Sequence, residues 1–394
     1  MSLWELSGLL LVDKPSGPTS FDLARNVRRV SGQKSVGHIG TLDPLATGLM
    51  GILLGPATRL APYLSGLSKT YWARVVLGLT TTTDDVTGAT LAHWSGLLPT
   101  KENVAEVLSS FLGARPQKPP AFSAIKRGGQ VAYKAARAGQ PLDLAPRLVT
   151  ALDLSLLAWE PPEAVLRLTV SSGYYVRSLA RDWGQALGLG GGALKELRRE
   201  RIGPFVLTKA MALPTEREEL SHRLISPRQA LPFLTEVLVT ESEAQKLTRG
   251  QVIRSTLWNA GQAAHRRARS LGSQEVADRE LDPLDRAGLS LGGPDLGDLS
   301  VDDLSVGELN IDGQDLDGQD LDRLALAAKK ANVAEPSVLE RHGLAPHNGL
   351  AVKIVDPQGQ LLGLGQWEPR QGRGQPSGPF LRPLRVFRSP KAIG

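Results

Sequence analysis

The sequence predicts a mixed α/β fold followed by a smaller β-rich unit that an insertion divides. Residues 8–214 alternate short apolar runs with amphipathic stretches, and turn residues separate them. Strand-like apolar runs return in residues 237–253 and 350–367. Between these two runs, residues 259–348 lose the apolar periodicity. The chain has 394 residues, 41% of them hydrophobic and 22% charged, so it can bury a sizeable core.

The first predicted helix spans residues 20–30. Ser20 is a suitable N-cap, and apolar side chains recur at helical spacing from Leu23 to Val30. Gly32 follows the last of them and is typical of a helix stop. The outward face of this helix is rich in arginine.

Two strands and a second helix follow in the same unit. Residues 71–78 and 165–171 are rich in β-branched and aromatic side chains, which favours strands. Apolar positions in residues 176–187 recur at spacings of three and four, which predicts a helix. That helix begins directly after Tyr174 and Tyr175, so an aromatic pair lies at its first turn.

The C-terminal unit is predicted in two pieces. Residues 237–253 read as a strand, a capped helix and a glycine turn, and residues 350–367 read as two strands around a Pro-Gln-Gly turn. Residues 259–348 hold repeated Asp-Leu units, including Gly-Gln-Asp-Leu-Asp twice in succession. Low aromatic content and one-signed charge favour a solvated insertion over a short β-solenoid, whose few irregular units would bury little.

These patterns predict three divisions of the chain. The first domain covers residues 1–235, and the second is assembled from residues 236–258 and 349–394. The acidic insertion covers residues 259–348 and is expected to be flexible. We expect this insertion to be inert, although a protein-docking arm or an electrostatic mimic of RNA would have the same composition.

Charge and composition narrow the class of function. The net charge is +6, and ten acidic residues with no Lys or Arg lie between Asp295 and Asp322, so the rest of the chain carries +16. Much of that excess is arginine, which suits phosphate contacts. Cysteine is absent and the six histidines lack ligand spacing, which excludes disulfides and thiolate metal sites. No apolar run reaches the roughly 20 residues of a membrane span, so a cytoplasmic protein is expected.

The most informative segment is Gly-His-Ile-Gly-Thr-Leu-Asp-Pro-Leu-Ala-Thr-Gly-Leu-Met at residues 37–50. Its glycines permit tight bends and close approach to a large ligand. The spacing fits neither a P-loop nor a dinucleotide fingerprint. Asp43, followed by Pro44, is therefore either a carboxylate presented for catalysis on a constrained turn or a residue that merely stabilises the turn.

His38 and two further segments carry similar alternatives. His38 is either a functional residue or an ordinary loop histidine. Lys69 and Tyr71 open a predicted strand, and Tyr175 and Arg177 open a predicted helix, so each pair places an aromatic ring near a cation. A ring that stacks on a base and an arginine that pairs with a carboxylate would suit an enzyme acting on a nucleobase. A core aromatic and a surface charge are the alternatives.

Taken together, the segments resemble the TruB family of tRNA pseudouridine synthases. The opening Gly-Leu-Leu-Leu-Val-Asp-Lys-Pro-Ser-Gly stretch, residues 37–50, Ser-Lys-Thr-Tyr-Trp-Ala, Pro-Pro-Ala-Phe-Ser-Ala-Ile-Lys and Ser-Ser-Gly-Tyr-Tyr-Val-Arg appear in the family's order. The resemblance covers roughly residues 8–254 and resumes near 350. It implies a pseudouridine-synthase-like mixed, mainly antiparallel sheet with flanking helices, and a small β-rich PUA-like C-terminal domain.

The resemblance also implies roles for several candidate residues. Asp43 would be the essential carboxylate, Tyr71 would stack on the target uracil, and Arg177 would pair with Asp43. His38 would fill the space left by the extruded base. The resemblance also places Tyr175 and Leu197 in the pocket and Asp85 near the bound nucleotide. Apart from the resemblance, Lys69 is a candidate RNA-binding cation, and Arg198 and Arg199 are expected to contact phosphates, with a solvated face as the alternative.

The implied reaction is isomerisation of uridine to pseudouridine in the T loop of tRNA, at position 55. It changes no oxidation state and transfers no group between molecules, so no cofactor and no metal are expected. The expected partner is the T arm of tRNA, with no membrane and no obligate protein partner. Two alternatives stay open: a guide-RNA-dependent synthase acting on ribosomal RNA, and a non-catalytic tRNA-binding or folding factor.

Overall fold

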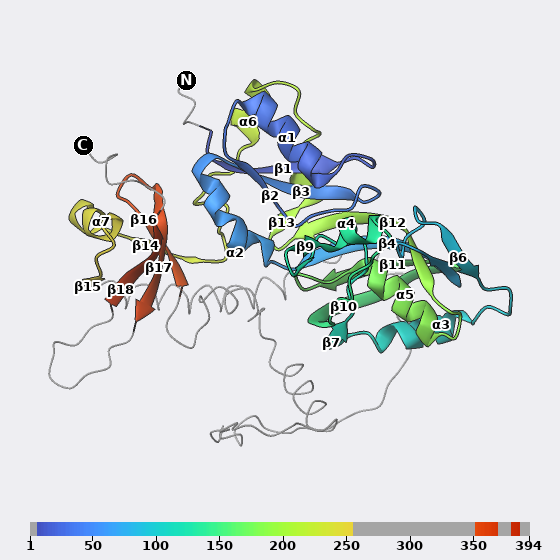
Figure 1. The fold of residues 1–394 in the computed structure, drawn as a ribbon. Coiled ribbons are helices and arrows are strands. Elements are labelled where there is room, and N and C mark those ends of the chain that lie inside the picture. Colours follow the sequence, from blue (N-terminus) through green and yellow to red (C-terminus); the bar gives the residue numbers. More distant parts are fainter. Residues whose placement is uncertain (1–5, 255–350, 369–379, 387–394) are drawn as a thin grey trace, which may run out of the picture. The chain divides into compact units, whose positions relative to one another are not determined.

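The computed structural model describes residues 6–254, 351–368 and 380–386, which form two larger β-sheets, two small hairpins and the helices (Figure 1). The helices are α1 (Ser20–Ser31), η1 (Gly55–Leu60), α2 (Ala61–Ser65), α3 (Lys101–Ser109), α4 (Ala132–Arg137), α5 (Val176–Ala186), η2 (Leu207–Lys209), α6 (Glu218–Arg223) and α7 (Glu241–Thr248). The strands of the first sheet are β1 (Gly8–Lys14), β2 (Val36–Ile39), β3 (Thr47–Leu54), β4 (Lys69–Leu77), β7 (Gly113–Gln117), β10 (Arg147–Glu160), β11 (Glu163–Val170), β12 (Gly192–Ile202) and β13 (Phe205–Val206). Two small hairpins pair β5 (Leu79–Thr81) with β6 (Thr90–His93), and β8 (Lys126–Arg127) with β9 (Gln130–Val131).

The first sheet is mixed and mainly antiparallel, as the sequence predicts. Its order is β1-β3-β12-β4-β11-β10-β7, with β2 paired to β3 and β13 to β12. Every pairing in it is antiparallel except that of β12 with β3. Helix α5 packs against β12 and β4, α3 packs against β10, and α1 lies beside β2 and β3. The sheet thereby brings the loop after β2, the start of β4 and the start of α5 into one region.

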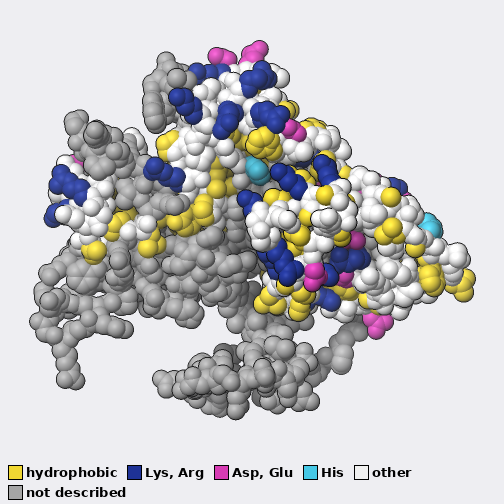
Figure 2. Space-filling view, viewed as in Figure 1, with side chains coloured by type: hydrophobic (Ala, Val, Ile, Leu, Met, Phe, Trp, Pro, Cys, Tyr) yellow, Lys and Arg dark blue, Asp and Glu magenta, His cyan; other side chains and the backbone are white. Residues whose placement is uncertain are grey.

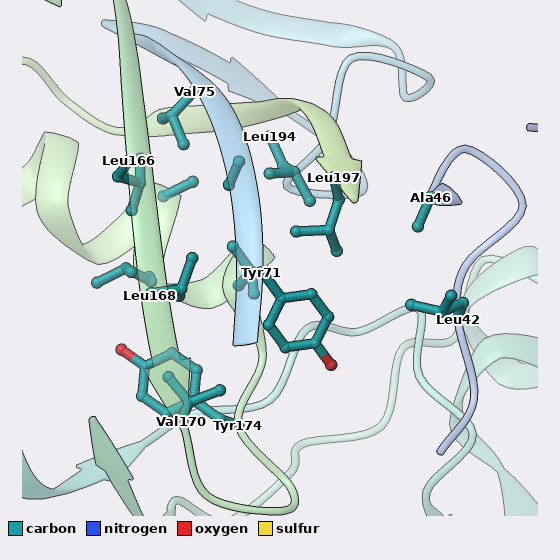
Figure 3. Close-up of a cluster of buried hydrophobic side chains, with 14 of the residues drawn as sticks. Leu42, Ala46, Tyr71, Val75, Leu166, Leu168, Val170, Tyr174, Leu194 and Leu197 are labelled. Carbon is teal, nitrogen blue, oxygen red and sulfur yellow. The ribbon is translucent and has the colours of Figure 1, made fainter. Parts of the chain in front are cut away.

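One of the two core clusters packs α1 and α5 against this sheet. Trp183 of α5 is fully buried, and so are Leu166 and Leu168 of β11. Figure 3 shows the Tyr71 ring projecting from β4 toward the side on which Leu42 lies, with Leu197 close to it. Burial of each large apolar side chain contributes about 1.5 to 3 kcal/mol. This cluster therefore stabilises the part of the sheet from which Tyr71 projects.

Helix α1 forms where the sequence predicts it, with one correction. Its N-cap is Thr19, whose side chain accepts from the Asp22 amide in a capping box, and not Ser20. The physical reason is spacing, because Thr19 has an acidic residue three positions later and Ser20 does not. Gly32 ends the helix in the left-handed conformation, with φ of 68°, as predicted.

The other predicted elements of the first sheet are also observed. The strand predicted at residues 71–78 is β4, and the one predicted at 165–171 is β11; both begin two residues earlier. The helix predicted at 176–187 is α5, whose first turn follows Tyr175 as expected.

The second sheet takes strands from both sides of the interval 255–350. Its order is β14 (Thr235–Leu238), β16 (Ala351–Val355), β17 (Leu361–Glu368), β18 (Phe380–Val386) and β15 (Ile253–Arg254). The predicted strand, capped helix and turn correspond to β14, α7 and Gly250, and the predicted hairpin to β16 and β17. The predicted insertion, residues 259–348, lies outside the described residues. Across the part that the structure describes, no helix is long and apolar enough to span a membrane.

Candidate active site

Asp43 lies on a loop whose main chain is anchored at three points. Gly40, with φ of 69°, turns the chain after β2. Ser20 of α1 holds Leu42 twice: its hydroxyl donates to the Leu42 carbonyl at 3.0 Å and accepts from the Leu42 amide at 2.8 Å. Lys14, fully buried at the end of β1, donates to the carbonyls of Pro44 at 3.1 Å and Ala46 at 2.6 Å.

The carboxylate of Asp43 pairs with Arg177, as the resemblance implies. Arg177 Nε lies 2.9 Å from Asp43 Oδ2, and 5% of the Arg177 side chain is exposed against 38% for Asp43. The guanidinium is fixed by two further donations, from Nη1 to the Thr83 carbonyl at 3.0 Å and from Nη2 to the Phe122 carbonyl at 2.9 Å. Arg177 is therefore oriented by main-chain acceptors on two other segments, and its Nε is left for Asp43.

Asp85 is a second acidic residue at the same guanidinium. Its Oδ2 lies 3.7 Å from Arg177 Nη1, and its side chain is buried. Its Oδ1 accepts from the Thr83 hydroxyl at 2.8 Å and from the Thr87 amide at 2.9 Å. Asp85 is thus held in the turn after β5, and one arginine is shared between two carboxylates.

Opposing effects set the protonation of Asp43. Burial among neighbouring atoms raises the pKa of Asp43 above its usual value, Arg177 opposes that rise by charge and hydrogen bonding, and Asp85 adds to it. Lys14 also acts to lower the pKa of Asp43. Burial in turn lowers the pKa of Lys14 to about 8, with Arg199 contributing in the same direction and Asp43 opposing.

Tyr175 is brought to the same site by a side chain that sequence reasoning missed. Gln117, at the end of β7, accepts from the Tyr175 amide at 2.9 Å and donates to the Tyr175 carbonyl at 3.1 Å. Burial raises the pKa of Tyr175; the charges of Arg147 and Arg177 oppose this rise, and that of Asp43 adds to it. No sequence pattern links positions 117 and 175, because the contact is made only when the sheet and α5 pack together.

Tyr71 and Leu197 form the apolar side of the site. Tyr71 is 8% exposed and Leu197 is 9% exposed, and they come from the neighbouring antiparallel strands β4 and β12. Figure 3 shows the two side chains next to each other with Leu42 on the far side of the ring. His38 of β2 lies within 3.2 Å of the Thr41 hydroxyl through Nε2, and burial lowers its pKa, which favours the neutral imidazole.

The cationic candidates are placed differently from one another. Arg198 is 41% exposed and pairs with Asp13 at 2.7 Å. Lys69 is buried and donates from Nζ to the carbonyls of Ser65 and Leu67. Arg199 has no exposed area, so its placement differs from the phosphate contact expected for it. Figure 2 shows cationic and acidic side chains next to one another over β9, α4 and β10.

The described residues show which ligands the site can and cannot hold. No group of three or more His, Asp or Glu side chains in residues 6–254, 351–368 and 380–386 is arranged to hold a metal ion. What the arrangement offers instead is an accessible carboxylate beside a buried arginine, with an aromatic ring and a leucine next to it. Such a site can accept a flat ring and present a negative charge to it.

Comparison with known proteins gives a consistent result. The family model described as TruB family pseudouridylate synthase (N terminal domain) matches residues 28–176. A tRNA pseudouridine synthase B of Parasynechococcus marenigrum is 45% identical over 240 residues, which is 60% of this chain and 81% of that protein. The protein of the same name from Acaryochloris marina is 39% identical over 282 residues, 70% of this chain and 97% of that one.

Solved structures share the fold at low sequence identity. The crystal structure of a Cbf5-Nop10-Gar1 complex contains a chain that aligns with a TM-score of 0.57 and 19% identity, covering 98% of this chain and 86% of that one. The structure of an H/ACA RNP bound to a substrate RNA containing 2'-deoxyuridine gives 0.55 and 18%, with 97% and 86% covered. At these identities the similarity concerns the fold.

Proposed function

This chain belongs to the TruB family of pseudouridylate synthases, and we propose that it converts uridine 55 in the T loop of tRNA to pseudouridine, with Asp43 as the essential carboxylate. Both relatives described above carry the name tRNA pseudouridine synthase B, which supports tRNA as the substrate. The observation that carries the proposal is the 2.9 Å pair between Asp43 and Arg177. Leu42, directly before Asp43, belongs to the same buried cluster as Tyr71 and Leu197.

The reaction needs one carboxylate and one base. The bond between N1 and C1′ breaks, the uracil turns, and a bond forms between C5 and C1′; C5 loses a proton and N1 gains one. A carboxylate at Asp43 can add to C6 of the uracil, attack C1′, or stabilise a positively charged sugar. Each route requires the ionised form, and Arg177 favours it by opposing the effect of burial on the pKa of Asp43.

The target base has to leave its stack to reach Asp43. Extrusion costs a few kcal/mol. Stacking on Tyr71 would return about 1 to 3 kcal/mol, by analogy with aromatic residues that bind single strands. Tyr175 and Leu197 would close the pocket around the ring, and the neutral imidazole of His38 would fill the space that the base leaves. Asp85 would hold Arg177 in place.

Phosphate contacts would supply the remaining stabilisation. The residues outside the acidic segment carry +16, and 41% of the Arg198 side chain is exposed. Each lysine or arginine that neutralises a phosphate releases counterions, so binding should weaken steeply with salt. Lys69 is buried and held by carbonyls, so its role would be to fix the start of β4 and not to reach the RNA backbone.

The proposal is tested by release of tritium from a tRNA transcript labelled at C5 of uridine. The wild-type protein alone should release one proton from position 55 of each tRNA, and none from that position when it is cytidine. Asp43→Asn should lower the rate by at least about a hundredfold, whereas the control Asp153→Asn, at an exposed position of β10, should leave it unchanged. Full release by the Asp43→Asn variant would falsify the assignment, and a requirement for an added guide RNA would reject the tRNA substrate.

A further inference from the structure

The side chain of Arg199 is a buried charge that the proposed chemistry does not use. It has no exposed area. Its Nε donates to the Leu49 carbonyl at 2.7 Å and its Nη2 to the Gly40 carbonyl at 2.8 Å, while Nη1 is buried and has no hydrogen-bond partner among the described residues. Burying a permanent cation costs several kcal/mol, so an apolar residue would serve packing better at this position. The guanidinium therefore invites a functional explanation.

Tyr71 is the side chain that Arg199 meets across the sheet. The two residues are direct partners in the antiparallel pairing of β12 with β4, so their side chains point to the same face. Burial lowers the pKa of Arg199, and the nearby Tyr71 hydroxyl opposes that decrease. Arg199 and Tyr71 are thus buried cross-strand neighbours.

Arg199 also supports the bend that precedes Asp43. Gly40 is three residues before Asp43, and its carbonyl accepts from Nη2. A Cβ added at Gly40 would lie 3.1 Å from Arg199 Nη1, which shows how closely the guanidinium packs against the bend. The parallel pairing of Arg199 with Gly48 of β3 fixes the main chain from which this side chain extends.

We infer that Arg199 is a positioning residue for the reaction: it ties the Gly40 bend to the Tyr71 hydroxyl, so that the Asp43 carboxylate and the Tyr71 ring keep a fixed separation around one uracil. The planar guanidinium suits this task because it can donate in several directions at once from a rigid group. This inference rests on the proposed function, since it concerns the geometry of that same site. It replaces the phosphate contact that the sequence predicted for Arg199.

The test compares Arg199→Met and Arg199→Lys with the wild type on labelled tRNA. Three quantities are measured: the single-turnover rate at saturating enzyme, the Kd for tRNA, and the slope of log Kd against log salt. Arg199→Met should lower the rate about a hundredfold, the scale expected when reacting groups are misplaced by about 1 Å. Its Kd should stay within about threefold of the wild type, with the same salt slope. Arg199→Lys should recover part of the rate, because one ammonium can still reach one of the two carbonyls.

The matched control is Arg74→Met, which removes an arginine from β4 in the same sheet. Arg74 is partly buried and pairs with Glu163 at 3.1 Å and Glu196 at 3.4 Å. Its loss should lower stability and leave the single-turnover rate of the folded protein within about twofold of the wild type. This control separates the loss of an arginine from the loss of its contact with the site.

A double-mutant cycle keeps the inference testable if Arg199→Met does not fold. Tyr71→Phe removes the hydroxyl and keeps the ring. If Arg199 acts through that hydroxyl, the rate losses of Arg199→Lys and Tyr71→Phe should be clearly less than multiplicative when combined. Multiplicative losses would overturn the inference.

Two other results would also overturn it. The first is a raised Kd with a smaller salt slope and a normal rate, which would make Arg199 a phosphate contact. The second is a lowered Tm with a normal rate per folded molecule, which would make it a scaffold residue. Failure of the proposed function is distinguishable from both, because it would be seen as absence of tritium release by the wild type.

Discussion

Replacement of Ser20 by alanine should loosen the loop that carries Asp43. The Ser20 hydroxyl is buried at the start of α1 and bonds both the amide and the carbonyl of Leu42, the residue directly before Asp43. Alanine removes both bonds and leaves two main-chain groups of Leu42 without a partner in the protein interior. Because the backbone at Leu42 sets the direction of the next side chain, a loss of stability and a loss of activity should occur together.

The expected loss in the free energy of unfolding follows from the amide and the carbonyl of Leu42, which both lose their partner. A buried donor or acceptor left without a partner costs about 1 to 3 kcal/mol, so the pair costs about 2 to 6 kcal/mol in the free energy of unfolding. The higher helix propensity of alanine returns about 0.5 kcal/mol. A net loss of about 3 kcal/mol should lower Tm by roughly 9 °C, at about 3 °C per kcal/mol for a domain of this size.

The measurement is thermal unfolding followed by tryptophan fluorescence, together with tritium release below the transition. Ser16→Ala is the matched control, because the Ser16 hydroxyl also bonds this loop, at the Leu45 carbonyl at 3.3 Å, but is exposed. Water can replace that bond, so Ser16→Ala should change stability by less than about 0.5 kcal/mol. If the Tm values of the two variants agree within about 2 °C, burial of the Ser20 bonds does not stabilise the loop and the reasoning is refuted.

Two further variants test the charges of the site. Arg177→Gln removes the cation that opposes the effect of burial on the pKa of Asp43, so this pKa should rise and the acidic limb of the single-turnover pH profile should move to higher pH; a limb that stays in place or moves to lower pH contradicts the assignment. Arg198→Gln should weaken tRNA binding and reduce the slope of log Kd against log salt by about 1, measured between 50 and 200 mM KCl. An unchanged slope would show that Arg198 neutralises no phosphate.

The sequence predicts the elements of the first sheet well where one periodicity dominates. The β-branched runs at β4 and β11 predict strands, and the apolar spacing at α5 predicts a helix. Each prediction is clear because the apolar positions fit a single period. The predicted N-cap of α1, Ser20, lies one residue after the observed N-cap, Thr19, although the sequence distinguishes the two. Thr19 with Asp22 has the spacing of a capping box, and Ser20 instead uses its hydroxyl to bind the loop.

In the candidate site, two neighbouring arginines show a different limit of prediction from sequence. Arg198 and Arg199 look equivalent in the sequence, but side chains alternate across a strand and so the two face opposite sides of β12. Leu197 was expected in the pocket, and Arg199, two residues later, shares its face. The alternation of side chains along a strand therefore distinguishes the two arginines. The local excess of arginine hides this difference when charge alone is considered. No sequence pattern indicates the role of Gln117, because its side chain hydrogen-bonds the main chain of Tyr175, which is distant in sequence.

The anchoring of Asp43 has a consequence for how its carboxylate can work. Lys14, Ser20 and Arg199 all bind main-chain carbonyls of the loop, so the position of the backbone does not depend on what the carboxylate does. The carboxylate itself pairs with Arg177 and remains 38% exposed. A side chain held in this way can turn from its cation to an incoming ring without moving the loop. Variants at Ser20 and Arg199 should therefore alter the rate of the chemical step more than the ionisation of Asp43, whereas changes at Arg177 should do the reverse.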